Sequence, residues 1–263
     1  MKSRRKTTSR DDSDKRNEQA AVGGDATQIP RRNGMEKKHT SSSYEQELQE
    51  AKEGLLQSGI LVEEAIGKAL KALVEGDTEL AHAVISGDRR IDEIDIAIEE
   101  RCIRLLALRQ PAATDLRFIA TAIKVNGHLE RIGDMAVNIA QRVVLLNDLP
   151  RIKPYVDIPR MADIARGMIR DSLDALVRQD LDLANRVRRE DEKVDQLEDQ
   201  ITRELITFMM EDPRRIHPAL LIMQVAKNIE RISDHAEGIA HMVVFLITGR
   251  IVRHARSMGE EAP

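Results

Sequence analysis

The sequence predicts an all-α fold of two tandem, duplicated three-helix bundles, with six long antiparallel helices and a disordered N-terminal extension. Hydrophobic residues make up 41% of the 263-residue chain, but aromatic residues make up only 2%. A core of Ala, Leu, Ile, Val and Met is typical of helix bundles, because strands draw on aromatic and β-branched residues. The second observation is an internal repeat, in which one helical pattern and one set of acidic residues occur twice.

The N-terminal segment, residues 1–40, is polar and basic and has no apolar periodicity. It carries 11 Lys or Arg and 6 Asp or Glu, whereas residues 41–263 carry 30 and 39. Such a segment cannot bury enough apolar surface to offset the entropy of ordering, so we expect a disordered extension. Met35 offers an alternative start of translation. The acidic charge of the remaining chain argues against nucleic acid as a partner.

The single cysteine, Cys102, excludes an internal disulfide and a thiolate zinc cluster. No apolar run approaches 18 residues, and the basic N-terminus lacks the apolar stretch of a secretory signal. We therefore expect a cytoplasmic protein without a membrane span.

Apolar periodicity and proline place the helices of the first unit. Apolar residues recur every seven positions from Leu48 to Ala69 and predict a helix over 44–76. A second helix is expected over 78–110, where Pro111 ends it.

A third helix is expected to run to Asn147, with Thr114 or Asp115 as its cap. Three prolines then fall within residues 150–159, a density that no helix interior tolerates. This stretch is the expected linker.

The second unit repeats the pattern, with helices expected over 161–179, 181–211 and 218–248. Asp212 and Pro213 suit a turn before the last of them. The expected domain boundaries are 1–40 for the extension, 41–149 for the first bundle, 150–158 for the linker, 159–250 for the second bundle and 251–263 for a tail.

The repeat can be followed residue by residue. Glu130–Leu146 and Glu230–Leu246 match at ten of seventeen positions with an offset of 100. Earlier helices match at an offset of 103, so that Asp88 corresponds to Asp191. The chain is therefore a duplicated three-helix unit.

Acidic residues cluster on two helices of each unit. The third helix carries Glu-x-x-x-Asp, whose carboxylates lie about 40° apart on one face, and the second helix carries a matching acidic stripe. Like charges at this spacing repel by about 0.2–0.5 kcal/mol per pair, which solvent or a cation must relieve. Carboxylates on facing helices suit magnesium, manganese or iron. The candidate metal ligands are Glu130, Asp134, Glu230, Asp234, Asp88, Asp92, Asp191 and Asp195, with Asp95 and Glu198 as further members.

Two other interpretations stay open. Arg131 and Arg231 could pair with the carboxylates, which would leave a solvated face on a metal-free helical adaptor. A ferritin-like di-metal enzyme needs Glu-x-x-His on two helices, but Glu79 and His82 form a single copy without a counterpart. The sequence has no glycine-rich phosphate loop, CxxC pair or nucleophile elbow, so no catalysis is predicted.

Several motifs together resemble the PhoU family. They are the run from Ile103 to Pro111, the step Asp115-Leu-Arg117, and the paired Glu130-Arg-Ile-Gly-Asp134 and Glu230-Arg-Ile-Ser-Asp234. The resemblance covers about residues 44–250 and implies two three-helix bundles. It also implies a non-catalytic negative regulator of phosphate uptake and phosphate-starvation signalling.

Partners and cofactors also follow from the resemblance. Members contact the ATPase subunit of the phosphate ABC transporter and a sensor histidine kinase, and some bind multinuclear iron or zinc through the acidic motifs. A homodimer that is peripheral to the membrane through its partners is therefore expected. The two units differ, because Met135 and Asn138 stand opposite His235 and Gly238. The two metal sites therefore need not be equivalent, and His235 is expected to be an outer partner of the metal.

Overall fold

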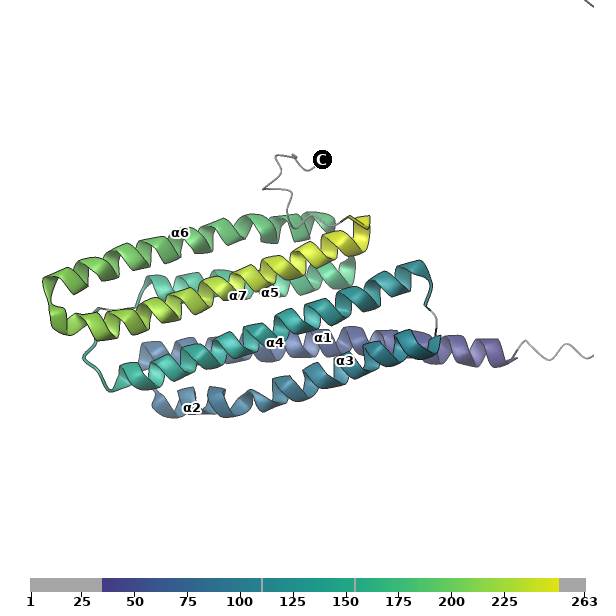
Figure 1. The fold of residues 1–263 in the computed structure, drawn as a ribbon, viewed down its shortest axis with the longest axis horizontal. Coiled ribbons are helices and arrows are strands. Elements are labelled where there is room, and N and C mark those ends of the chain that lie inside the picture. The colour runs from purple at the N-terminus through teal and green to yellow at the C-terminus, as the bar shows by residue number, and fades with distance from the viewer. Residues whose placement is uncertain (1–34, 110, 154, 251–263) are drawn as a thin grey trace, which may run out of the picture.

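The computed structural model describes residues 35–109, 111–153 and 155–250, and these residues form an all-helical structure (Figure 1). The α-helices are α1 (Met35–Glu75), α2 (Thr78–Gly87), α3 (Arg89–Arg109), α4 (Ala113–Asn147), α5 (Asp157–Arg178), α6 (Leu181–Glu211) and α7 (Ile216–Thr248). A 3₁₀ turn over Pro213–Arg215 joins α6 to α7, at the predicted turn. The predicted fold class is confirmed, with α1–α4 as the first unit and α5–α7 as the second.

The helix α1 begins at Met35. Residues 35–40, which the sequence predicts to be disordered, are therefore helical. Polar helix-forming residues can prolong a helix whose later turns are already stabilised by packing. The rest of the predicted extension, residues 1–34, and the predicted tail, residues 251–263, lie outside the described residues.

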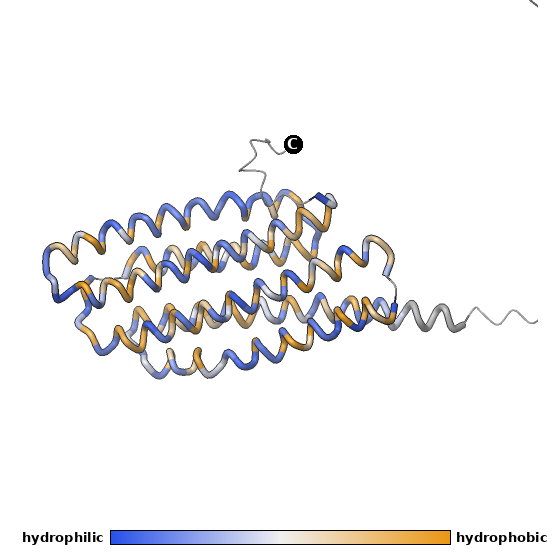
Figure 2. Tube along the Cα trace, viewed as in Figure 1, coloured by the Kyte–Doolittle hydropathy of each residue, from blue (hydrophilic) through white to orange (hydrophobic). Residues whose placement is uncertain are grey.

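The two units pack side by side through two pairs of helices. α4 lies against α7 and α1 lies against α5, while α3 and α6 lie on opposite outer flanks (Figure 1). The buried side chains of both units join into one hydrophobic core. The helix α6 is mainly hydrophilic along its length (Figure 2). No described helix is both long and apolar enough to cross a membrane.

Close approach between the units depends on two glycines. A side chain at Gly59 of α1 would collide with Leu173 of α5, and one at Gly238 of α7 would collide with the ring of His128 on α4. A larger residue would therefore force Leu173 at the first contact, or the His128 ring at the second, to move. Glu63 adds an ionic contact between α1 and α5 by accepting hydrogen bonds from arginines of α5.

Equivalent aspartates cap equivalent helices. Asp77 Oδ1 accepts a hydrogen bond from the backbone N–H of Leu80 at 2.9 Å, and Asp180 Oδ1 accepts one from Leu183 at 2.9 Å. These two residues correspond at the offset of 103. The caps show that the repeat extends to the hydrogen bonds that begin α2 and α6.

The second predicted helix is interrupted at Asp88, between α2 and α3. Gly87 precedes the interruption, and glycine costs about 1 kcal/mol in a helix interior relative to alanine. The second unit has Glu190 at this position, and α6 runs through it without a break. The sequence-based prediction of one continuous helix in the first unit is therefore wrong.

Three other helix starts differ from the prediction. α4 begins after Ala112, which makes no side-chain cap, whereas Asp115 accepts a hydrogen bond from the Tyr44 hydroxyl at 3.0 Å. α5 and α7 begin earlier than expected, and each contains a proline, Pro159 and Pro218, as its third residue. Proline is tolerated there because N–H groups of the first turn have no partner within the helix.

Gln179, which ends α5 in a left-handed backbone conformation, allows the equivalence of the two units to be tested. Gln179 has φ of 53°, whereas Gly76, its equivalent after α1, has φ of 73°. We expect Gln179→Gly to raise the free energy of unfolding by about 0.5–1 kcal/mol, because left-handed strain exceeds the entropy cost of glycine. Chemical denaturation measures this change. Gly76→Gln, the matched control, should lower stability, and an unchanged midpoint for Gln179→Gly would contradict the argument.

Candidate functional site

The acidic residues of the first unit lie on facing sides of α3 and α4. Burial raises the pKa of Asp88, and repulsion from Asp92 and Asp134 raises it further. Burial and Asp134 likewise raise the pKa of Glu130, with smaller contributions from Asp95 and Asp92. Carboxylates of both helices therefore influence one another across the helix pair. We call this set the first acidic face; it comprises Asp88, Asp92, Asp95, Glu99, Glu130 and Asp134.

Two polar side chains, Arg131 and Asn126, contact the carboxylates of the first acidic face. Arg131 Nε lies 3.4 Å from Glu130 Oε2, and Arg131 Nη1 lies 3.5 Å from Asp134 Oδ2, so the expected ion pair is present. The buried Asn126 donates hydrogen bonds to Asp95 Oδ1 at 2.6 Å and to the Asp95 carbonyl at 2.9 Å. Asn126 is missing from the sequence-based set. Its signal was an amide at an apolar-periodic position of α4.

The second acidic face lies between α6 and α7. Burial raises the pKa of Asp191 to about 7, with Glu237 and Asp195 as the leading charges. Burial, Glu230 and Asp195 raise the pKa of Asp234 to about 6. Glu237 is a member that the sequence-based analysis missed, because it lies outside the duplicated motif. The face comprises Asp191, Asp195, Glu198, Glu230, Asp234 and Glu237.

The charge that offsets the second acidic face comes from an unexpected residue. Lys227 Nζ lies 2.8 Å from Glu230 Oε1, one turn earlier on α7. Arg231 was expected to pair with these carboxylates by analogy with Arg131. Instead, Arg231 acts on His235, whose pKa it lowers after the larger effect of burial.

The placement and hydrogen bonding of the carboxylates indicate whether the two faces fit a cation. Among the residues that the structure describes, no three His, Cys, Asp or Glu side chains are placed so that they could hold one metal ion. However, Asp191 Oδ1 and Glu230 Oε2 are buried without a hydrogen-bond partner. A buried acceptor without a donor costs about 1–3 kcal/mol, which a bound cation would relieve. Both of these acceptors belong to the second acidic face, and the metal sites stay a prediction for both units.

His235 lies at the contact between the two units. Its Nδ1 atom lies 3.0 Å from Nδ1 of His128, across the contact between α4 and α7. The rings are edge to face, with centroids 5.3 Å apart. The ring of His235 therefore contacts the other unit through Nδ1, and its role beside a metal stays a prediction.

The enzyme alternative has no site in the described chain. Glu79 and His82 are both exposed on α2, so this single copy is not part of a buried di-metal centre. Cys102 is buried, and burial raises the pKa of its thiol to about 11, which suppresses the reactive thiolate.

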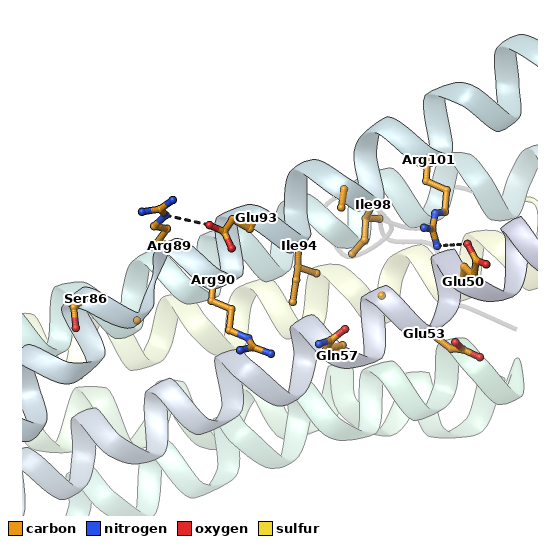
Figure 3. A pocket seen from close by; sticks show the side chains of 13 residues that line it. Glu50, Glu53, Gln57, Ser86, Arg89, Arg90, Glu93, Ile94, Ile98 and Arg101 are labelled. Atoms are coloured by element: carbon orange, nitrogen blue, oxygen red, sulfur yellow. Dashed lines mark hydrogen bonds and ion pairs between the residues drawn. The ribbon is translucent and has the colours of Figure 1, made fainter.

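A groove of about 950 Å³ lies between α1 and the α2–α3 segment (Figure 3). Arg90, Ile94 and Gln57 line its centre, and the Arg101–Glu50 ion pair at 2.8 Å lies at one end. None of the predicted metal ligands lines it. The groove and the first acidic face are thus separate features of the first unit.

The fold and these faces define a class of protein. Two tandem, duplicated helix bundles with paired acidic faces define a duplicated helical-bundle protein. The chain belongs to the PhoU family. The PhoU domain model matches residues 55–143 and 158–243, one match in each unit. Members of this family are accessory proteins, and the chain is a regulator rather than an enzyme.

Relatives support this assignment over most of the chain. The phosphate-specific transport system accessory protein PhoU homologue of Aquifex aeolicus is 46% identical over 208 residues, covering 79% of this chain and 94% of its own length. The crystal structure of PhoU from Pseudomonas aeruginosa superposes with a TM-score of 0.76 at 39% identity, covering 79% and 100%. PhoU from Streptococcus pneumoniae gives 0.73 at 32% identity, covering 80% and 99%.

The raised pKa of Asp191 predicts a pH-dependent effect of its removal. A carboxyl with a raised pKa in the folded state binds its proton more tightly there, so its destabilising charge develops between about pH 4 and pH 7. In chelator, Asp191→Asn should change stability little at pH 4.5 and raise the free energy of unfolding by about 1–3 kcal/mol at pH 8.

Urea denaturation at the two pH values measures this difference. Asp88→Asn, the equivalent change at a more exposed carboxyl, should have a smaller effect. An equal gain from Asp191→Asn at both pH values would contradict the assigned titration.

Proposed function

We propose that this chain is a non-catalytic negative regulator of phosphate uptake and phosphate-starvation signalling. The observation that carries the proposal is the match to the PhoU family in both units, with relatives named as phosphate-specific transport system accessory proteins. The protein acts by binding the ATPase subunit of a phosphate ABC transporter and a sensor histidine kinase. It works in the cytoplasm, where the ATPase subunit of an ABC transporter lies, as a homodimer that reaches the membrane through its partners.

The two acidic faces are the proposed cation sites. Asp88, Asp92, Glu130 and Asp134 would hold a cation in the first unit, with Asp95 beside them. Asp191, Asp195, Glu230 and Asp234 would hold one in the second unit, with Glu198 beside them. Buried acceptors without donors and carboxyls with raised pKa values support this assignment. The ion would be iron, zinc, manganese or magnesium, and its charge would relieve the repulsion between the helices.

A metal-free helical adaptor is the second candidate. The contacts of Arg131 with Glu130 and Asp134, and of Lys227 with Glu230, favour it because they neutralise part of each face. The adaptor would use the same surfaces for partner contacts. The two candidates differ only in whether a cation is present.

Loss of the gene should derepress phosphate-scavenging genes in phosphate-rich medium, because a regulator that acts by binding can no longer restrain the kinase. A transcriptional reporter in a deletion strain measures this effect, with the intact gene restored as the control. Expression that stays phosphate-responsive in a strain without a second copy would contradict the proposed function.

Metal content separates the two candidates. Asp134→Asn should reduce bound metal by roughly half, and the double change with Asp234→Asn should nearly abolish it, because each removes one carboxylate cluster. Elemental analysis of the purified proteins measures this loss. The adaptor instead predicts background metal in all three proteins and a gain of about 0.2–0.5 kcal/mol in stability from removing a like charge.

A further inference from the structure

We infer that the groove between α1 and the α2–α3 segment docks an acidic, partly apolar segment of a partner protein, the ATPase subunit of the phosphate transporter. A carboxylate of that segment pairs with Arg90, and an apolar side chain beside it covers Ile94. This inference rests on the proposed function, because it assigns a surface and a chemistry to one of the proposed partner contacts. The ATPase subunit belongs to the transport system for which the relatives are named.

Three arginines line the groove, and two of them are paired within it (Figure 3). Arg89 Nε lies 3.0 Å from Glu93 Oε1, and Arg101 Nη1 lies 2.8 Å from Glu50 Oε2. Arg90 is exposed and makes no hydrogen bond or ion pair with any residue that the structure describes. Its guanidinium is therefore available to a carboxylate from another protein, and such pairs are geometrically specific.

The second unit shows which partner Arg90 lacks. Lys193 is the equivalent of Arg90 at the offset of 103, and its Nζ lies 2.6 Å from Glu190 Oε1. Gly87 stands at the position of Glu190 in the first unit and lines the groove. The first unit thus keeps the cation but has no carboxylate at that position to pair with it.

The groove lies where the second unit has a bridge between its helices. Gln200 of α6 donates a hydrogen bond to Asp157 of α5 at 3.4 Å. Their equivalents at the same offset are Ala97 and Gly54, which both line the groove and have no polar side chain. The bridge is therefore absent in the first unit, and a volume of about 950 Å³ stays open between the helices.

Apolar side chains of α3 line the same groove. Ile94 is only partly buried, whereas its equivalent in the second unit, Leu197, is 7% exposed. Ile98, one turn further along α3, is buried where it lines the groove. An apolar side chain of the partner would remove the remaining surface of Ile94 from water, which favours binding.

The charges of α1 set the direction in which an acidic segment can lie. Glu53 is placed toward the end that holds the Arg101–Glu50 pair, whereas Arg90 extends toward Gln57 (Figure 3). A carboxylate of the partner is repelled near Glu53 and attracted near Arg90. The acidic residue of the docked segment should therefore lie at the Arg90 end of the groove.

The test measures binding of the full chain to the purified ATPase subunit encoded by the same genome, by isothermal titration calorimetry. Arg90→Glu should weaken binding at least about tenfold, because repulsion replaces attraction for the partner's carboxylate. Ala97→Gln copies the second unit, fills part of the groove without a change in charge, and should also weaken binding. The matched controls, Lys193→Glu and Gln200→Ala, change the equivalent positions of the second unit and should leave the affinity unchanged.

A photocrosslinking residue in place of Gln57 identifies what lies in the groove. Irradiation of the complex should link this position to a peptide of the ATPase subunit that contains an acidic residue next to an apolar one. The same residue in place of Arg160, the exposed equivalent on α5, should give no link to that peptide.

The outcomes separate this inference from the proposed function. If the parent protein binds the ATPase subunit but Arg90→Glu and Ala97→Gln bind it equally well, the docking surface is wrong while the proposed function stands. If the parent does not bind the subunit, the inference and that part of the proposed function are both wrong. A cross-linked peptide without an acidic residue would overturn the assigned chemistry. Should Arg90→Glu fail to fold, Ala97→Gln decides the test.

Discussion

The apolar packing of α4 against α7 is the interaction on which the rest of this structure depends, and it places the acidic faces at fixed positions on either side. Six acidic residues line the α3–α4 pair and six line the α6–α7 pair. The helices α4 and α7 supply the central apolar seams of the core and cannot move apart without exposing it. The carboxylates beside these seams are therefore held close to one another. Arg131 and Lys227 offset only part of the charge. The fold therefore holds two strongly negative surfaces close to its core.

Duplication explains why the two surfaces resemble each other, and substitution explains why they differ. The capping aspartates and the acidic motifs recur at equivalent positions, so both units present carboxylates from the same two helices. At Gly87 the first unit interrupts its second helix, whereas Glu190 keeps α6 continuous. Asp191 is accordingly buried, while its equivalent Asp88 is partly exposed. A shared backbone thus carries two versions of the same face that differ in how deeply this one aspartate is buried.

Periodicity and repetition were enough to predict the fold class and most members of the two acidic faces. Helices over thirty residues long leave a strong apolar pattern, and equivalent acids at a constant offset mark the surfaces that face each other. Local cues were weaker. The break between α2 and α3 after Gly87, and the start of α4 after Ala112, have no strong signal in the sequence. The contact of His235 with His128 depends on how α4 crosses α7, and no spacing within one helix encodes that crossing. Glu237 lies outside the duplicated Glu-x-x-x-Asp motif, so the repeat alone does not reveal it.

The central claim is that each acidic face holds a cation, and anomalous diffraction tests it most directly. Crystals of the full chain soaked in manganese, with data collected near the manganese absorption edge, would locate the ions without reference to function. The account predicts one or more anomalous peaks between α3 and α4, near Asp88 and Asp134, and others between α6 and α7, near Asp191 and Asp234. Peaks confined to other surfaces, or no peaks in well-ordered crystals, would contradict it and leave the carboxylates as a solvated surface of a metal-free adaptor.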